Sequence, residues 1–374
     1  MRKSIYILPL LTILYFFSCS SDDNTPDPGN DFNRESLTTS WVDNLLLPAT
    51  NDLKTKLTTL NSSVATFTTT PDVTNLNKVR ADLFEAYKVW QHVEMFFYGG
   101  GYALDMNSYP ADVTKIKENI NAVSVDLNRT VLNSSQGLPA VDYLVNGFAA
   151  TDNEIITLYG EAKNKNYLKL LTERMLTLTT DNLTEFEAKK NENIKSVDNT
   201  ISSYFSRQVN DFIQYTEKSF REKKIAIPSG TRNRDIFPTI SVSASPDFVE
   251  SLYSPENSKA LYLEAYDAIQ DFYYGRSYAS GANTVGLQEY LQALKTTVLV
   301  SGNDILLDAY IKQLFDKIDT ANGNITNNFN AQTQNYNSNF DAVFDAIQEF
   351  VVAAKSNMIN AFNLTIDFAD NDGD

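Results

Sequence analysis

The sequence predicts an all-α protein made of two antiparallel helical bundles related by internal duplication. Apolar residues recur at helical spacings of three and four from Phe32 onward, and no segment shows a convincing series of alternating strands. Short motifs of the first half also return in the same order in the second half. With 374 residues, 43% of them hydrophobic, the chain suffices for one large domain or two ordinary ones.

The N-terminal residues predict export. The stretch MRKSIYILPLLTILYFFS has a basic start and an apolar run too short to span a membrane, which indicates a signal peptide at 1–18. Cys19, the only cysteine, resembles the lipidated cysteine of bacterial lipoproteins, and residues 19–31 then form a lipidated tether. We expect anchoring to the outer membrane, on its periplasmic side or at the cell surface. The acids after Cys19 resemble a surface-export signal of some Bacteroidetes lipoproteins; a solvated tether is the alternative.

Helical stripes fill most of the remaining chain. One long helix is predicted from Asn199 to Lys224, where Ile201, Phe205 and Val209 begin a single apolar face. The other predicted stripes are 33–65, 72–98, 112–133, 153–189, 257–274, 284–299, 303–322 and 325–363. Between them, residues 226–256 are rich in Pro, Ser and Gly and predict a linker. The N-terminal bundle is therefore expected at 32–225, and the C-terminal bundle with an acidic tail at 257–374.

Two echoes support a duplication across this linker. EAYKVWQ at 85–91 returns as EAYDAIQ at 264–270, and both are followed by an aromatic pair and a glycine. GLPAVDYL at 137–144 returns as GLQEYL at 286–291 with a two-residue gap, which pairs Asp142 with Glu289. Because both echoes occur in the same order, we predict a repeated helical unit.

The charge excludes one class of partner. The formal net charge is −16, and removal of the signal peptide makes it −18, since 29 basic residues then face 47 acidic ones. Nucleic acid is not an expected partner, because its recognition needs clustered positive charge. The acidic balance favours solubility outside the cell and also attracts cations.

The stretch QGLPAVDYLVNG at 136–147 predicts a helix start that presents an acid. Gly137 permits a close approach, and Pro139 suits a first helical turn because its missing N–H needs no partner there. Asp142 would then lie in or near that turn, where the helix dipole favours an anion. A plain helix start without a ligand is the alternative.

This stretch resembles the site motif of the imelysin family, Gly-x-His-x-x-Glu. Gly137 matches the glycine, Pro139 stands at the histidine and Asp142 at the glutamate. The segment VWQHVEMFFYGG, with Trp90 and Glu94, and the segment EKSFREKKIAIPSG also resemble family segments in the same order. The resemblance implies two four-helix bundles with a site in the groove between them, and an association with bacterial iron uptake.

The substitutions argue against a zinc peptidase, although the family is named for peptidase activity. Pro139 removes a nitrogen ligand, and the chain has only one histidine, His92, so it cannot supply two histidine ligands. His92 and Glu94 are two residues apart and point to different sides of a helix, which prevents a chelate on one face. A hydrogen-bonded histidine is the alternative for His92.

An all-oxygen metal site is the remaining hypothesis. Asp142, Glu94 and Glu289 are the predicted ligands, and a hard cation such as ferric iron accepts carboxylates without histidine. Calcium and zinc stay as alternatives. Arg276 is a candidate contact for an anionic ligand such as an iron chelate; a solvated charge is the alternative.

Three functions stay open at this stage. The leading hypothesis is an exported imelysin-like lipoprotein that binds iron, an iron complex or an outer-membrane uptake partner between its bundles. The alternatives are a metal-dependent peptidase and a non-catalytic scaffold with a degenerate site. The C-terminal DNDGD resembles half of a calcium loop, but it lacks the distal glutamate, which favours a solvated acidic end.

Overall fold

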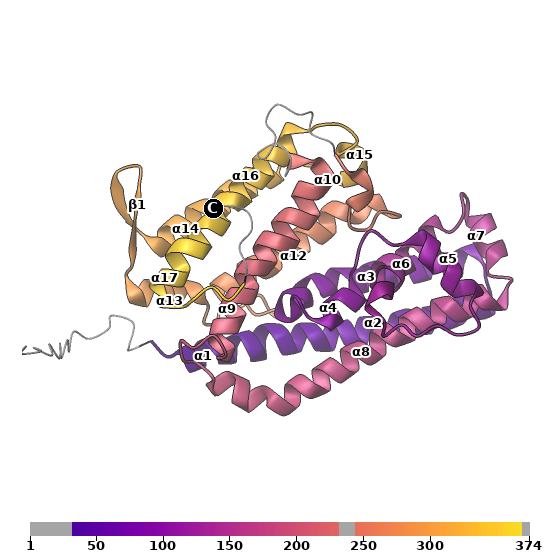
Figure 1. Cartoon of the computed structure of the whole chain (residues 1–374), viewed down its shortest axis with the longest axis horizontal. Coiled ribbons are helices and arrows are strands. Elements are labelled where there is room, and N and C mark those ends of the chain that lie inside the picture. The colour runs from indigo at the N-terminus through magenta and orange to yellow at the C-terminus, as the bar shows by residue number, and fades with distance from the viewer. Residues whose placement is uncertain (1–31, 232–243, 369–374) are drawn as a thin grey trace, which may run out of the picture.

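The structure is a computed structural model that describes residues 32–231 and 244–368. The predicted signal peptide, the tether with Cys19, residues 232–243 of the predicted linker and the acidic tail lie outside the described residues. The described chain is helical apart from one small hairpin, which confirms the predicted all-α class. Figure 1 shows two helical groups, one indigo to pink and one salmon to yellow, that meet along one side.

The first bundle is built on three long helices. Residues 34–69 run as one continuous helix through α1 (Arg34–Ser40), the π-helical η1 (Trp41–Leu46) and α2 (Leu47–Thr69). The helix α3 (Val73–Val93) returns beside α2, and α8 (Ala162–Lys195) covers α2. Shorter elements close the bundle: η2 (Glu94–Phe97), α4 (Gly101–Met106), α5 (Val113–Asn121), η3 (Thr130–Ser135), α6 (Gly137–Asp142), η4 (Tyr143–Gly147) and α7 (Asp152–Leu158).

The second bundle begins with another continuous helix. It runs through α9 (Tyr204–Gln214), the π-helical η5 (Tyr215–Ala226) and α10 (Ile227–Ser229). The other long helices are α12 (Ser258–Tyr274), α14 (Leu307–Asn322) and α16 (Ser338–Ala353). The remaining elements are η6 (Pro246–Phe248), η7 (Pro255–Asn257), α13 (Leu287–Leu294), α15 (Phe329–Gln332), η8 (Ala354–Met358) and α17 (Ile359–Ala361).

Polar side chains at the helix starts explain several of these boundaries. Asn33 accepts hydrogen bonds from the backbone N–H groups of Glu35 and Ser36 and so caps α1. Asp72 caps α3 in the same way through the N–H of Asn75, at 2.8 Å. Because Asp72 follows the end of α2 by only three residues, the turn is short and α2 and α3 form an antiparallel pair.

Two clusters of buried apolar residues form the core. One holds the inner faces of α2, α3, α6 and the first half of α8, with Trp90 fully buried. The other holds α9, η5, α12, α14 and α16 together with Trp41, which is also fully buried. The helix 34–69 contributes to both clusters, and so does the α3–η2 segment.

The core cluster of the second bundle includes residues that precede the predicted bundle boundary at residue 225. Apolar residues between 205 and 225, assigned from sequence to the N-terminal bundle, pack inside the second cluster. The apolar stripe of this helix was found correctly, but the pattern does not say which bundle it faces. Ile201, the first residue of the predicted stripe, is outside the helix and 58% exposed.

One predicted helical region is a β-hairpin. Strands β1 (Thr297–Val300) and β2 (Asn303–Leu306) pair antiparallel, with Thr297 opposite Leu306, where the stripes 284–299 and 303–322 were predicted to be helical. The turn residues Ser301 and Gly302 have φ values of 50° and 84°, a left-handed pair that favours a two-residue hairpin over a continuing helix. The hairpin projects from the second bundle in Figure 1.

The duplicated motifs occupy corresponding places in the two bundles. The first echo lies on α3 and α12, which pack against each other where the bundles meet. The second echo begins in both cases at a tightly packed glycine. A Cβ on Gly137 would lie 2.3 Å from the carbonyl oxygen of Met106, and one on Gly286 would lie 2.3 Å from the backbone nitrogen of Gly275.

Candidate functional site

A buried polar cluster lies where the two bundles meet. It is formed by α3, η2 and the turn before α5 on one side, and by η5 and the segment 249–254 on the other. One of the contributing elements, η5, is π-helical, a feature that is frequent at functional sites.

Glu94 is the central acid of this cluster. It is 5% exposed at the start of η2, and its Oε1 accepts a hydrogen bond of 3.3 Å from the Ser219 hydroxyl. Its Oε2 is buried and has no hydrogen-bond partner among the residues that the structure describes. Burial raises the pKa of Glu94, and the nearby Lys224 ammonium opposes that shift.

Buried tyrosine hydroxyls lie within electrostatic reach of this carboxylate. The hydroxyls of Tyr109 and Tyr215 are buried and, within the described part of the chain, lack hydrogen-bond partners. Burial raises the pKa of both phenols well above the usual range, and the charges of Glu94 and Glu250 add to both shifts. The Tyr98 ring meets that of Tyr215 edge-on, with ring centroids 5.9 Å apart. Glu94 and these phenols therefore gather several oxygen atoms whose bonding capacity is unused.

A buried ion pair closes the cluster on the side of Glu250. Lys224 and Glu250, 3% and 4% exposed, are in direct contact. Glu250 also accepts hydrogen bonds from the side chains of Gln91, at 3.0 Å, and Asn107, at 2.7 Å. Lys224 donates to the Gln91 Oε1 at 2.8 Å, and Tyr87 donates to Asn107 at 3.0 Å. This network satisfies the buried charges and fixes the segment around Glu250, which the sequence treated as linker.

Asp142 holds a different part of the same segment. It is 1% exposed, and its carboxylate accepts from the backbone N–H of Tyr253 at 3.0 Å, the hydroxyl of Ser254 at 2.7 Å and the side-chain amide of Asn146 at 2.9 Å. Burial raises the pKa of Asp142 to about 6, while these hydrogen bonds oppose the shift. Asn146 and Ser254 also line a cavity of about 100 Å³ with Arg80 and Tyr87.

The start of α6 differs from the sequence expectation at Asp142. Gly137 begins the helix with a φ of +73°, and Pro139 lies buried in the first turn. Asp142 is the last residue of α6 rather than part of its first turn, because the helix starts at Gly137 itself. The N-terminal helix dipole therefore does not stabilise its anion; hydrogen bonds to the segment 253–254 do.

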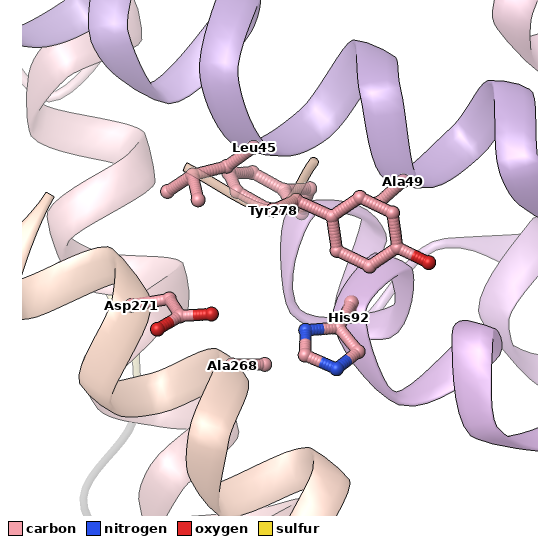
Figure 2. Close-up of a pocket in the computed structure, with 7 residues that line it drawn as sticks. Leu45, Ala49, His92, Ala268, Asp271 and Tyr278 are labelled. Atoms are coloured by element: carbon pink, nitrogen blue, oxygen red, sulfur yellow. The ribbon is translucent and has the colours of Figure 1, made fainter. Parts of the chain in front are cut away.

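His92 lies apart from Glu94 on the other side of α3. Its Nε2 is 3.0 Å from a carboxylate oxygen of Glu264 on α12, and its ring meets the Tyr278 ring edge-on at 5.1 Å. Figure 2 shows His92 and Asp271 facing a small space between the helices, with Leu45 and Ala49 above it. This space is about 10 Å³, enough for about one water molecule. His92 joins α3 to α12, as expected for a hydrogen-bonded histidine.

Arg276 and Glu289 have structural partners of their own. Arg276 Nε is 2.7 Å from a carboxylate oxygen of Asp271, and its guanidinium stacks over the Tyr274 ring. Glu289 accepts from the backbone N–H of Gly286 at 2.8 Å and so caps α13. Glu289, which corresponds to Asp142 in the repeat, thus caps its own helix.

The predicted three-carboxylate site is not assembled in this structure. In residues 32–231 and 244–368, no group of three or more His, Cys, Asp or Glu side chains is arranged to hold a metal ion. Both oxygens of Asp142 accept hydrogen bonds, and Glu289 caps a helix; of these three described residues, Glu94 alone has a buried oxygen without a hydrogen-bond partner.

Sequence reasoning missed most of this cluster. Lys224, Glu250, Gln91, Asn107, Tyr109 and Tyr215 were not predicted as site residues. Lys224 lies in the quoted segment EKSFREKKIAIPSG, and Gln91 lies in the first repeated motif. Those two positions carried a usable signal, whereas a lone acid such as Glu250 in a Ser-rich and Pro-rich segment carried none.

Comparison with known proteins agrees with this architecture. The imelysin family model matches residues 46–355, most of the chain. The chain belongs to the imelysin family. None of the curated protein sequences is significantly similar to this imelysin.

Two solved structures share the fold of this imelysin. One is described as an iron-regulated protein A precursor from Parabacteroides distasonis, with a TM-score of 0.62 and 18% identity over 86% of this chain and 93% of that chain. The other is an imelysin-like protein from Psychrobacter arcticum, with a TM-score of 0.64 and 14% identity over 90% of this chain and 99% of that chain. At these identities the likeness establishes the fold alone. In the described part of this imelysin, none of the helices has the length and apolarity needed to cross a membrane.

Proposed function

We propose that this imelysin is an exported, lipid-anchored protein that binds ferric iron or an iron complex between its two bundles. Its iron would be cargo, received from or passed to an uptake component of the outer membrane. Cys19 would carry the lipid and hold the protein at that membrane. Two facts support an iron-related role: membership of the family, and a structural relative described as an iron-regulated protein precursor.

The unpartnered Oε2 of Glu94 is the observation that carries the proposal. A buried carboxylate oxygen without a hydrogen-bond partner is unfavourable unless a ligand uses it. The buried hydroxyls of Tyr109 and Tyr215 share this condition, and they lie within electrostatic reach of Glu94. These oxygen donors suit a hard cation, and phenolates bind ferric iron. A trivalent ion would also oppose the effect of burial on the pKa of the two phenols.

The donor atoms available at this site favour ferric iron over zinc and calcium. Zinc sites are usually built from cysteine and histidine. The only histidine, His92, is held by Glu264. Calcium takes six to eight oxygen ligands, several of them carboxylates, whereas Glu250 beside this site is already bound to Lys224. Ferric iron is the cation that carboxylate and phenol oxygens favour here.

The test is calorimetric titration of the mature protein, starting at Ser20, with ferric citrate, ferrous iron, zinc and calcium. We expect ferric iron to bind and Glu94→Gln to weaken that binding at least tenfold. Metal binding requires the ionised carboxylate, so two buffers of different ionisation enthalpy should also reveal proton release. Glu289→Gln is the matched control, because Glu289 only caps α13 and the amide can keep that hydrogen bond.

A visible charge-transfer band would identify the phenol ligands. We expect the band in the ferric complex, and its loss or shift in Tyr109→Phe and Tyr215→Phe. Tyr273→Phe is the control, because Tyr273 has a buried hydroxyl without a partner in the described second bundle. Equal ferric binding by wild type and Glu94→Gln would overturn the assignment of this site. No binding of any of the four metals would favour the scaffold hypothesis.

A further inference from the structure

A second, larger cavity lies outside the polar cluster around Glu94. It has a volume of about 320 Å³ and lies between η2, the C-terminal half of α8 and the start of α9. Pockets for small organic ligands have volumes of about 300 Å³ and more, whereas one water molecule occupies about 30 Å³. This cavity is therefore large enough for an organic ligand and too large for a single bound water.

Aromatic rings form one part of its lining. Phe96 and Phe97 enter from η2, Phe186 from α8, and Tyr204 from the first turn of α9. Phe186 and Tyr204 lie against each other, with ring centroids 6.1 Å apart. Such rings pack on flat apolar faces of a ligand.

Tyr204 presents its ring to the cavity, and its hydroxyl lies buried behind the lining. Tyr204 is 3% exposed, and its hydroxyl is buried with no hydrogen-bond partner in the described regions. A buried hydroxyl in this condition loses its hydrogen bonds to water and gains nothing in exchange. Because water cannot reach this oxygen, a ligand in the cavity cannot reach it either, and Tyr204 contributes its ring to the lining.

Charges around the cavity balance in sign. Lys189 is paired with Glu185 at 2.7 Å, and Arg207 lies near Asp211. Burial, followed by the charge of Asp367, raises the pKa of Asp211 to about 7. Near neutral pH this carboxyl therefore holds a proton part of the time, and it can both donate and accept hydrogen bonds. The lining has no excess charge for an anionic chelate or an organic cation.

Amide side chains complete the polar lining. Asn182, Asn193 and Gln208 border the cavity, and each amide offers both donors and an acceptor. Gln208 lies 3.5 Å from the carboxylate of Asp211. Aromatic faces combined with amides and a carboxyl suit a ligand whose ring has apolar faces and a rim of hydroxyl groups.

We infer that this cavity is a binding site for a neutral polyhydroxylated ring, of the size of one or two sugar units, held by the aromatic rings and side-chain amides of its lining. The site shares no ligand residue with the proposed iron site at Glu94. It gives the protein a second ligand of a different chemical class.

Titration of the mature protein with matched carbohydrates tests this inference. The panel contains neutral monosaccharides and disaccharides, the corresponding sugar acids and the corresponding amino sugars, followed by saturation-transfer NMR and calorimetry. We expect saturable binding of at least one neutral sugar. Gln208→Leu, which removes one amide from the lining, should weaken it about three- to tenfold, the effect of one hydrogen bond. Asn182→Trp should abolish it by filling the cavity, since Asn182 bonds only within its own helix among the described contacts.

Two controls separate this result from folding and from iron binding. Gln292→Leu removes a side-chain amide from α13, outside the cavity lining, and should leave sugar binding unchanged. Glu94→Gln should leave it unchanged as well. The inference is wrong if no neutral sugar binds at millimolar concentration, if sugar acids or amino sugars bind more tightly, or if Asn182→Trp binds as the wild type does.

Discussion

Gly137 is the residue of the family motif whose role is clearest at the scale of single atoms. Its φ of +73° disfavours any residue with a side chain, and a Cβ there would lie 2.3 Å and 2.5 Å from the carbonyl oxygens of Met106 and Asp105. We expect Gly137→Ala to lower the free energy of unfolding by roughly 2–4 kcal/mol, from backbone strain and overpacking together. Urea unfolding followed by circular dichroism measures this.

Gly281→Ala is the matched control for the steric part. Gly281 has a similar φ of +67°, but no atom lies within 4 Å of the position that its Cβ would take. Its substitution should cost only the backbone strain, about 1–2 kcal/mol. Equal losses in the two variants would show that the close approach of Gly137 to residues 105–106 does not matter for stability.

At the scale of elements, the Lys224–Glu250 pair joins η5 to the segment that connects the bundles. Lys224→Met should destabilise the protein by about 3–5 kcal/mol, because it leaves Glu250 buried without its counter-charge. The double variant Lys224→Met/Glu250→Gln should lose less than the sum of the single variants, because it removes both charges. Thermal or urea unfolding of the four proteins gives this cycle.

An exposed ion pair is the control for that measurement. Lys312 and Asp316 form a helix-surface ion pair at 2.8 Å, with side chains 59% and 61% exposed. Lys312→Met should change stability by less than about 1 kcal/mol, because water screens such pairs. A loss for Lys224→Met no larger than this would contradict the role of the buried pair.

At the scale of the whole molecule, the two bundles share helices. The helix 34–69 places Trp41 in the core cluster of the second bundle and Leu53 in that of the first. The segment 73–97 likewise places Phe96 in the cluster of the second bundle and Trp90 in that of the first. Unfolding of one bundle would therefore expose core residues of the other. We expect one cooperative transition rather than two.

The two tryptophans provide one probe for each cluster. Trp90→Phe leaves Trp41 to report on the second bundle, and Trp41→Phe leaves Trp90 to report on the first. Within each variant, the fluorescence transition in urea should coincide with the circular dichroism transition, as two-state unfolding requires. A fluorescence midpoint clearly separated from that of circular dichroism would show that the bundles unfold independently.

The sequence by itself determined the helical class, the duplicated motifs and the family. These features are local properties of the sequence, because helical periodicity and short motifs do not depend on what the chain packs against. The same periodicity could not assign residues 205–225 to the correct bundle, and it extended helices across the hairpin at Thr297–Leu306.

Only the tertiary structure decided which acids meet which partners. Asp142 and Glu289 match each other in the repeat, yet one binds the segment 253–254 and the other caps its own helix. Glu94 was named from the family motif, whereas its neighbours Tyr109 and Tyr215 come from distant elements. Burial and long-range approach determine whether a polar atom is satisfied, and neither is encoded in the spacing of residues along one helix.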